Sequence, residues 1–134
     1  LNLENEAKGQ RRSILLHYKH GWGGGGAVTH GVIQSYRQSV YLPDPDIIIS
    51  GHVHEQYVFP IEQLRVSDLG SISQRTQYHV RIPTYKNEYK DGFGGWHVER
   101  GSPPKPIGAW WMRICTKVKR HEGLVFDIDF IQAK

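Results

Sequence analysis

The most constraining feature of the sequence is a run of three isoleucines, Ile47 to Ile49, that is closed by Gly51 after a single serine. A strand without polar alternation has to be covered on both faces, as the strands of parallel sheets are. A second segment with strand-like composition, residues 13–20, lies upstream, and four consecutive glycines at 23–26 follow it. Four glycines in a row exclude regular structure and predict a loop. The chain therefore has two short strand candidates that suit one parallel sheet.

A helix is predicted between these two strands. Apolar residues recur there at every fourth position: Val28, Val32, Tyr36 and Val40. This spacing places them on one face of a helix over residues 29–40, and Pro43 and Pro45 end it. Strand, helix and strand in this order predict a βαβ-like unit.

After residue 56 the pattern changes to alternation of apolar and polar side chains, which predicts half-buried strands. The alternation covers four segments: residues 57–61, 72–82, 110–118 and 124–130. In the second segment Arg75, His79 and Arg81 fall on the polar face. Residues 121–123 predict the turn of a C-terminal hairpin. The fold class expected is therefore α/β, with one βαβ-like unit followed by mostly antiparallel strands.

Length and composition set the broad limits. The chain has 134 residues, with 38% hydrophobic and 22% charged residues, which fits one folded domain over residues 1–134. Residues 1–12 are polar and predict no regular element. The formal net charge of +4 favours phosphate-bearing partners only weakly. A single cysteine, Cys115, excludes an internal disulfide framework, and no run approaches the ~18–20 apolar residues of a membrane span. We therefore expect a cytoplasmic protein that does not enter the membrane.

The candidate functional residues are histidines at the ends of the two apolar strands. His52 and His54 follow the isoleucine strand in Gly51-His52-Val53-His54, and His20 stands at the same place after the upstream strand. Ligand sites in α/β sheets form outside the carboxyl ends of the strands. Neutral imidazole is a good ligand for transition metal ions. If both bind one ion, the imidazoles of His20 and His52 should lie within about 5 Å of each other.

These segments resemble the calcineurin-like metallophosphoesterase family in its phage and bacterial forms. An apolar strand ending in His20-Gly21, a helix, and an apolar strand ending in Gly51-His52-Val53-His54 match the family's lone histidine and Gly-His-x-His motifs. The glycine-rich run and Asp46 before the second strand are also similar, and the resemblance covers residues 14–56. It implies that the later strands belong to the second sheet of a two-sheet sandwich.

The resemblance implies a metal site and a reaction. His20 and His52 would be ligands of the second metal, and His54 a ligand of the first. The cofactors implied are two divalent metal ions, Mn, Fe, Zn or Ni, which activate a water that attacks phosphorus. The substrate implied is a phosphate ester, either a phosphomonoester or a phosphodiester, with nucleotides and nucleic acids among the candidates.

The chain also departs from the family pattern. It has no Asp-x-His, no Gly-Asp and no Gly-Asn-His, so the family's bridging aspartate, asparagine ligand and phosphate-contacting histidine have no counterpart. We therefore expect the chain to be the C-terminal half of such an enzyme, with the missing N-terminal half of the same fold as its partner. The metal site would be incomplete, and these 134 residues alone would be inactive.

Two other functions remain open. One is a non-catalytic module that binds metal or nucleic acid through the three histidines and the mild basic balance. The other is a β-rich structural domain in which the His-x-His is incidental. The long loop of residues 85–107 is rich in glycine, proline and aromatics, and such loops are often functional. Its aromatics, Phe93 and Trp96 among them, either pin the loop to the core or stack on a nucleotide. Arg100 and Lys105 are either phosphate contacts or solvated surface.

Overall fold

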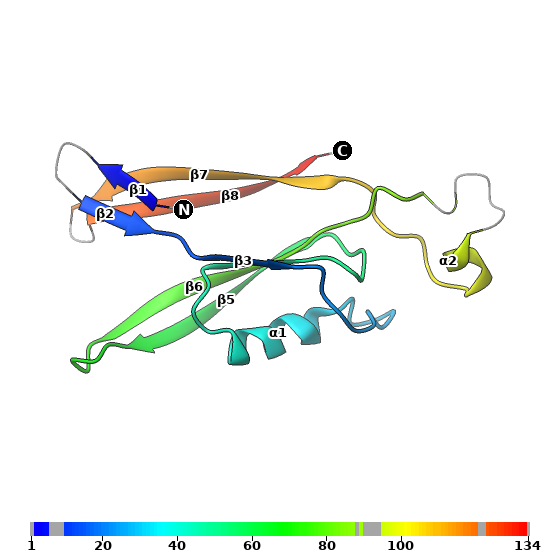
Figure 1. The fold of residues 1–134 in the computed structure, drawn as a ribbon, viewed down its shortest axis with the longest axis horizontal. Helices are drawn as coiled ribbons and strands as arrows, with labels where there is room; N and C mark the ends of the chain where they lie inside the picture. Colours follow the sequence, from blue (N-terminus) through cyan, green and yellow to red (C-terminus); the bar gives the residue numbers. More distant parts are fainter. Residues whose placement is uncertain (1, 6–9, 88, 90–94, 121–122, 134) are drawn as a thin grey trace.

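The computed structural model describes residues 2–5, 10–87, 89, 95–120 and 123–133 (Figure 1). It is an α/β chain with one mixed sheet and antiparallel strand pairs, as the sequence predicts. Within the described residues the elements are β1 (Asn2–Asn5), β2 (Gln10–Ser13), β3 (Leu16–Lys19), α1 (Val32–Tyr41), β4 (Ile47–Ser50), β5 (Tyr57–Val66), β6 (Ile72–Arg81), α2 (Trp96–Glu99), β7 (Ala109–Lys119) and β8 (Gly123–Ala133).

The central sheet has the strand order β3-β4-β6-β5. β3 and β4 are parallel, with Leu16 opposite Ile47, and α1 connects them, so the predicted βαβ unit is confirmed. β6 is parallel to β4 on its other side, and β5 pairs with β6 as an antiparallel hairpin. The expectation that the later strands form a second sheet is therefore wrong for β5 and β6, which belong to the central sheet. Ile47 and Ile48 are completely buried because β4 lies inside the sheet with a layer on each face.

The antiparallel pair β7–β8 covers one face of the central sheet (Figure 1). Ile14, Ile47 and Val80 form the buried core of this layer. Further apolar side chains from both sheets pack around them: Ile49, Val58, Tyr78, Trp110, Met112, Ile114, Phe126, Ile128 and Phe130. The alternation in the predicted strands at 110–118 and 124–130 therefore identifies side chains of β7–β8 that face the central sheet.

The expectation of no regular element in residues 1–12 is wrong. β1 and β2 pair as an antiparallel hairpin. Arg12 ties the second of these strands to β8, because its Nη1 donates to the carbonyl of Leu124 at 2.9 Å and its guanidinium lies 5.8 Å from the centre of the Phe126 ring. The two strands have the polar sequences NLEN and QRRS, so no apolar alternation marks them, and the Arg12 contact joins residues 112 positions apart. No local pattern therefore predicts the hairpin.

α1 covers the opposite face of the sheet, but not with the apolar stripe that the spacing suggests. Val28 and Val40 are 90% and 81% exposed, and the buried residues of the helix are Ser35 and Gln38. The helix also begins later than predicted, because Gly31 caps it in the left-handed conformation at φ 81°. The sheet face below α1 is polar, so the helix packs its polar side there.

The polar face of β6 lies beneath α1. His79 and Arg81, expected on the polar face of a half-buried strand, are 2% and 1% exposed. Hydrogen bonds connect this layer to the helix, since Gln63 donates to the carbonyl of Ser39 at 3.2 Å and Gln77 to that of Leu42 at 2.9 Å. In the part of the chain that the structure describes, no helix is long and apolar enough to cross a membrane.

Candidate metal centre

His20 and His52 meet at the carboxyl ends of the parallel strands β3 and β4. The amide of Gly51 donates to the carbonyl of His20 at 2.9 Å, which continues the pairing of the two strands past their ends. His20 Nε2 lies 3.1 Å from His52 Nδ1, and the ring centres are 5.2 Å apart at an interplanar angle of 78°. The closeness predicted for these two imidazoles is confirmed.

An unusual backbone turn presents these histidines. His52 and His54 have φ values of 70° and 55°, a region that residues other than glycine seldom adopt. Val53 donates its amide to the carbonyl of Gly51 at 2.9 Å, which closes the turn. Such backbone strain costs of order 1–3 kcal/mol per residue and clusters at functional sites. Gly21 also has a positive φ of 96°, and a Cβ there would lie 3.1 Å from the Gly51 carbonyl oxygen.

Arg81 holds this turn from below. Its guanidinium donates to the carbonyl of Gly51 at 3.2 Å, to the carbonyl of Gly31 at 3.5 Å and to the hydroxyl of Tyr57 at 3.3 Å. All three acceptors are neutral. The side chain therefore connects the histidine turn, the start of α1 and β5 through one buried cation. Sequence reasoning missed this residue, although its place at the end of the strand beside β4 was a usable signal.

The electrostatics around the pair are positive. Burial, and then the charge of Arg81, lower the pKa of Lys19, whose Nζ lies 3.7 Å from the centre of the Trp22 ring. Burial also lowers the pKa of His79 to about 4, with further contributions from Arg81 and Lys19. His79 is therefore neutral at pH 7. A positive surrounding attracts anions and makes a cation harder to bind without anionic ligands.

His54 points to a different neighbour. Its ring centre lies 5.7 Å from that of His97, on the short helix α2, with an interplanar angle of 55°. The adjacent residue, Glu55, is buried and contacts Lys105 and His30, the latter with 3.2 Å between His30 Nδ1 and Oε1. Burial alone would raise the pKa of Glu55, but hydrogen bonds from Lys105 and His30 outweigh it and hold the pKa below its usual value.

The donor geometry fits a metal ion only in part. Two nitrogens bound to one zinc ion at about 2.1 Å each lie about 3 to 3.5 Å apart, and the 3.1 Å between His20 and His52 agrees with that spacing. Over the described ranges, however, no three His, Cys, Asp or Glu side chains are grouped closely enough to hold a metal ion. His54 therefore does not join the pair, and its role as a ligand stays a prediction.

Comparisons with known proteins add no assignment. No family model, no curated protein and no solved structure matches the chain. The features of this chain that bear on function are therefore His20, His52 and His54, their motifs and the geometry around them.

Proposed function

We propose that the chain is the C-terminal half of a calcineurin-like metallophosphoesterase, a metal-dependent hydrolase of phosphate esters. The observation that carries the proposal is the approach of His20 Nε2 and His52 Nδ1 to 3.1 Å at the ends of two parallel strands. This spacing suits two ligands of one divalent ion. The motifs around both histidines point to the same family.

The residues have distinct tasks in this proposal. His20 and His52 hold the second ion, and His54 is a ligand of the first. Arg81 keeps the carbonyl of Gly51 in place and so positions the histidine turn. When bound, a pair of divalent ions supplies an activated water and neutralises charge on the phosphoryl oxygens. The positive surroundings of Lys19 and Arg81 favour the approach of an anionic ester.

An uncovered edge of the sheet supports the need for a second half. Among the described strands, β3 pairs with β4 only, although strands of parallel sheets are normally interior. Tyr18, on β3, is 78% exposed. A further strand beside β3 would cover this edge and could bring the carboxylates that a pair of dications requires.

Calorimetric titration of the chain with ZnCl2 tests the metal site. We expect about one ion per chain, bound weakly because the pair lacks a carboxylate. His20→Ala and His52→Ala should each lower the affinity by about tenfold or more, since each removes one of two ligands. Cys115→Ser is the control. The exposed thiol of Cys115 is itself a possible zinc ligand, so this variant shows whether the measured binding comes from the cysteine or from the histidines. Unchanged binding in both histidine variants, or loss of binding in Cys115→Ser alone, would contradict the proposal.

Hydrolysis gives a second test. The chain alone, with Mn²⁺ and an aryl phosphate, should show no activity above background, because the activated water needs two ions. In a parent protein that contains both halves, His52→Ala or His54→Ala should reduce kcat by roughly 100-fold or more, since even changes behind the ligands cost ~10–100-fold. Activity that survives both substitutions would exclude the mechanism.

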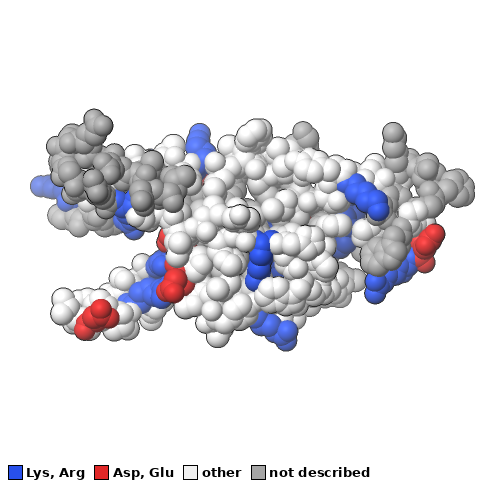
Figure 2. All heavy atoms as spheres, in the orientation of Figure 1, with Lys and Arg blue, Asp and Glu red and all other residues white. Residues whose placement is uncertain are grey.

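A nucleic-acid-binding module is the second candidate. A cleft between the sheets at the end far from α2 is lined by four cationic side chains, Arg12, Arg75, Lys117 and Lys119. Asp46 and Asp127 line it as well, and they pair with Arg75 and Lys117. Figure 2 shows lysine and arginine side chains in several separate places on this face rather than in one patch. Cations placed in this way give no continuous surface for a nucleic-acid backbone on this face.

A further inference from the structure

The hairpin of β5 and β6 ends in a group of exposed apolar side chains. Leu64 and Val66 lie on β5, Ile72 lies on β6 directly opposite Val66, and Leu69 lies in the turn between the strands. We call these four residues the hairpin tip. Their exposed fractions run from 69% to 95%. Apolar residues that are exposed singly are normal, but a group of them on one element marks an interaction site.

The strand register shows which way the hairpin tip faces. Val58 and Val80 are paired, and both pack toward β7–β8. Every second side chain of a strand points to the same face of the sheet, so Leu64 and Val66 share the face of Val58. Ile72 joins them because it pairs with Val66. The hairpin tip therefore continues the apolar face of the central sheet beyond the part that β7–β8 covers.

The two sheets diverge toward this end of the molecule. Figure 1 shows β5 and β6 moving away from β7–β8 as they approach their turn, and Figure 2 shows the hairpin as a projecting arm at the lower left. A cleft of about 540 Å³ lies between the sheets, with Gln74, Thr76 and Tyr78 of β6 on one side. Its volume is within the range of roughly 300–1,000 Å³ that is usual for ligand sites.

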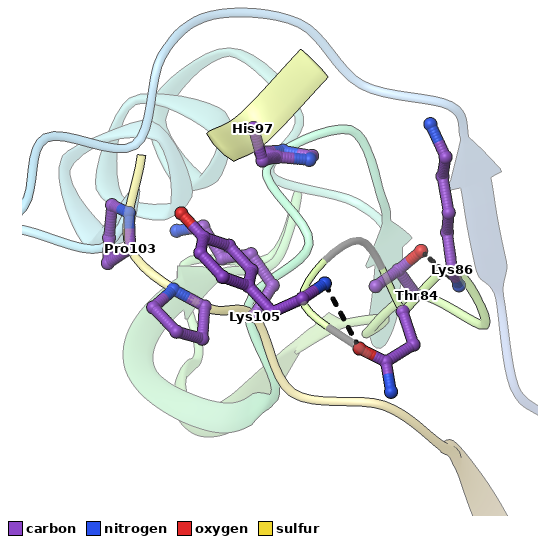
Figure 3. A pocket seen from close by; sticks show the side chains of 8 residues that line it. Thr84, Lys86, His97, Pro103 and Lys105 are labelled. Carbon is purple, nitrogen blue, oxygen red and sulfur yellow. Dashed lines mark hydrogen bonds between the residues drawn. The ribbon is translucent and has the colours of Figure 1, made fainter. Parts of the chain in front are cut away.

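The loop that connects β6 to β7 holds a smaller pocket, of about 30 Å³ (Figure 3). Figure 3 shows Lys86 extending away from Lys105, and Lys105 binds the carboxylate of Glu55. Of the loop residues expected to be functional, Phe93 lies outside the described residues, as does the side chain of Trp96. The cleft at the hairpin is therefore the stronger candidate for a binding site.

The wall of the cleft opposite the hairpin is positively charged. Arg12 on β2 and Lys117 and Lys119 on β7 line this wall, together with one carboxylate, Asp127. Within the described ranges Arg12 has no carboxylate partner, since its guanidinium donates to the carbonyl of Leu124. Lys117 pairs with Asp127, but both side chains are largely exposed, and exposed pairs contribute little to stability. An occupant with negative charge on this side would complement the wall.

We propose that the cleft and the hairpin tip bind an extended, acidic segment of a partner protein. Successive side chains of an extended segment point in opposite directions. One set, apolar, would cover the hairpin tip, and the other, acidic, would face Arg12 and Lys117. This orientation keeps the carboxylates of the segment away from Glu62 on the hairpin. A second copy of the chain suits the site less well, because its formal net charge is +4.

Fluorescence anisotropy with a labelled synthetic peptide that alternates leucine and glutamate tests the inference. We expect saturable binding, about tenfold tighter or more than that of a peptide that alternates leucine and lysine. Leu64→Ser and Ile72→Ser should each weaken binding of the acidic peptide by about tenfold, since each removes an apolar contact. Val40→Ser is the matched control, because Val40 is an exposed apolar residue of α1. It should bind as the wild type does.

Two further measurements separate this occupant from others. Lys117→Gln should weaken the acidic peptide severalfold and leave the lysine peptide no weaker. Circular dichroism should show that the Leu64→Ser and Ile72→Ser variants fold normally, because both positions are exposed. These tests need no metal ion, so their outcome is independent of the zinc titration and of the proposed function.

Several results would overturn the inference. Absence of binding, equal binding of the two peptides, or equal weakening by Val40→Ser would each exclude the acidic segment. A single-stranded DNA that displaces the peptide as effectively as unlabelled peptide does would assign the cleft to nucleic acid instead. Sedimentation that shows a dimer in the wild type and a monomer in Leu64→Ser would assign the hairpin tip to a second copy of the chain.

Discussion

The two faces of the central sheet are built from different chemistry. The face toward β7–β8 is apolar, with Ile47 and Val80 packed against the second sheet. The face toward α1 buries Gln77, His79 and Arg81, and it is connected to the helix by hydrogen bonds. The histidine turn lies at the end of this polar layer and is held by its arginine.

The difference indicates a division of tasks. Apolar packing is tolerant of small shifts and accounts for most of the stability of a domain. A buried polar network costs desolvation and gains little net energy, but it specifies one arrangement. We infer that the apolar face stabilises the fold and that the polar face sets the position of His52.

The largest effect should come from the apolar face. Ile47→Ala should lower the free energy of unfolding by about 2–5 kcal/mol, because the side chain is fully buried and leaves a cavity. Val40→Ala, at an 81% exposed position of α1, should change it by less than about 0.5 kcal/mol. Urea unfolding measures both. Equal effects would mean that the structure assigns the core to the wrong residues.

The polar face should make stability depend on pH. The pKa of His79 is about 4 in the folded chain, below its usual 6.5, so the unfolded chain binds more protons between these values. Stability should therefore fall as the pH drops from about 6.5 to 4, by roughly 3 kcal/mol from this group. His79→Gln keeps a partner for Gln77 and should flatten that part of the profile. A profile identical to that of the wild type would refute the assignment.

Substitution of Arg81 should lower the zinc affinity strongly while it changes the free energy of unfolding only a little. Arg81→Met removes a buried charge along with its hydrogen bonds, and these two terms offset each other, so stability should change by only about 1–2 kcal/mol. Removing the charge should favour zinc slightly, but losing the hydrogen bond that positions the histidine turn should outweigh this, so zinc affinity should fall by about 10-fold or more. Arg81→Lys should not rescue it, because lysine lacks the planar fork.

Arg37→Met, at an exposed position on α1, is the control for Arg81 and should leave zinc affinity unchanged. If Arg81→Met bound zinc as tightly as this control, the polar face would have no part in positioning the site. If Arg81→Met lost zinc affinity because it no longer folded, the polar face would be needed for stability too. The proposed division of tasks between the two faces would then be wrong.

Local patterns predict the fold and the histidine pair because both depend on short-range rules. Ile47 to Ile49 have no polar alternation, and a strand of that kind is interior. His20 and His52 follow strands joined by one helix, so a parallel pairing brings them to one edge. The alternation in β7 and β8 likewise reports which side chains face the core.

The remainder of the candidate site depends on contacts distant in sequence. His97 lies 43 positions after His54, in a loop without periodicity, so no pattern could pair the two. The burial of Arg81 was unpredictable for a related reason. The alternation in β6 correctly places Arg81 opposite the apolar face of that strand. It does not show that α1 covers the polar face with Ser35 and Gln38 turned inward, because that depends on tertiary packing.

In the proposed site His20 and His52 together hold one divalent ion. The most direct measurement is the ¹H–¹⁵N spectrum of the histidine ring nitrogens, recorded as Zn²⁺ is added to the chain. We expect the ring nitrogens of His20 and His52 to shift together and to saturate at one ion, while those of the buried His79 do not move. Shifts confined to other histidines, with His20 and His52 unchanged at saturating zinc, would contradict it.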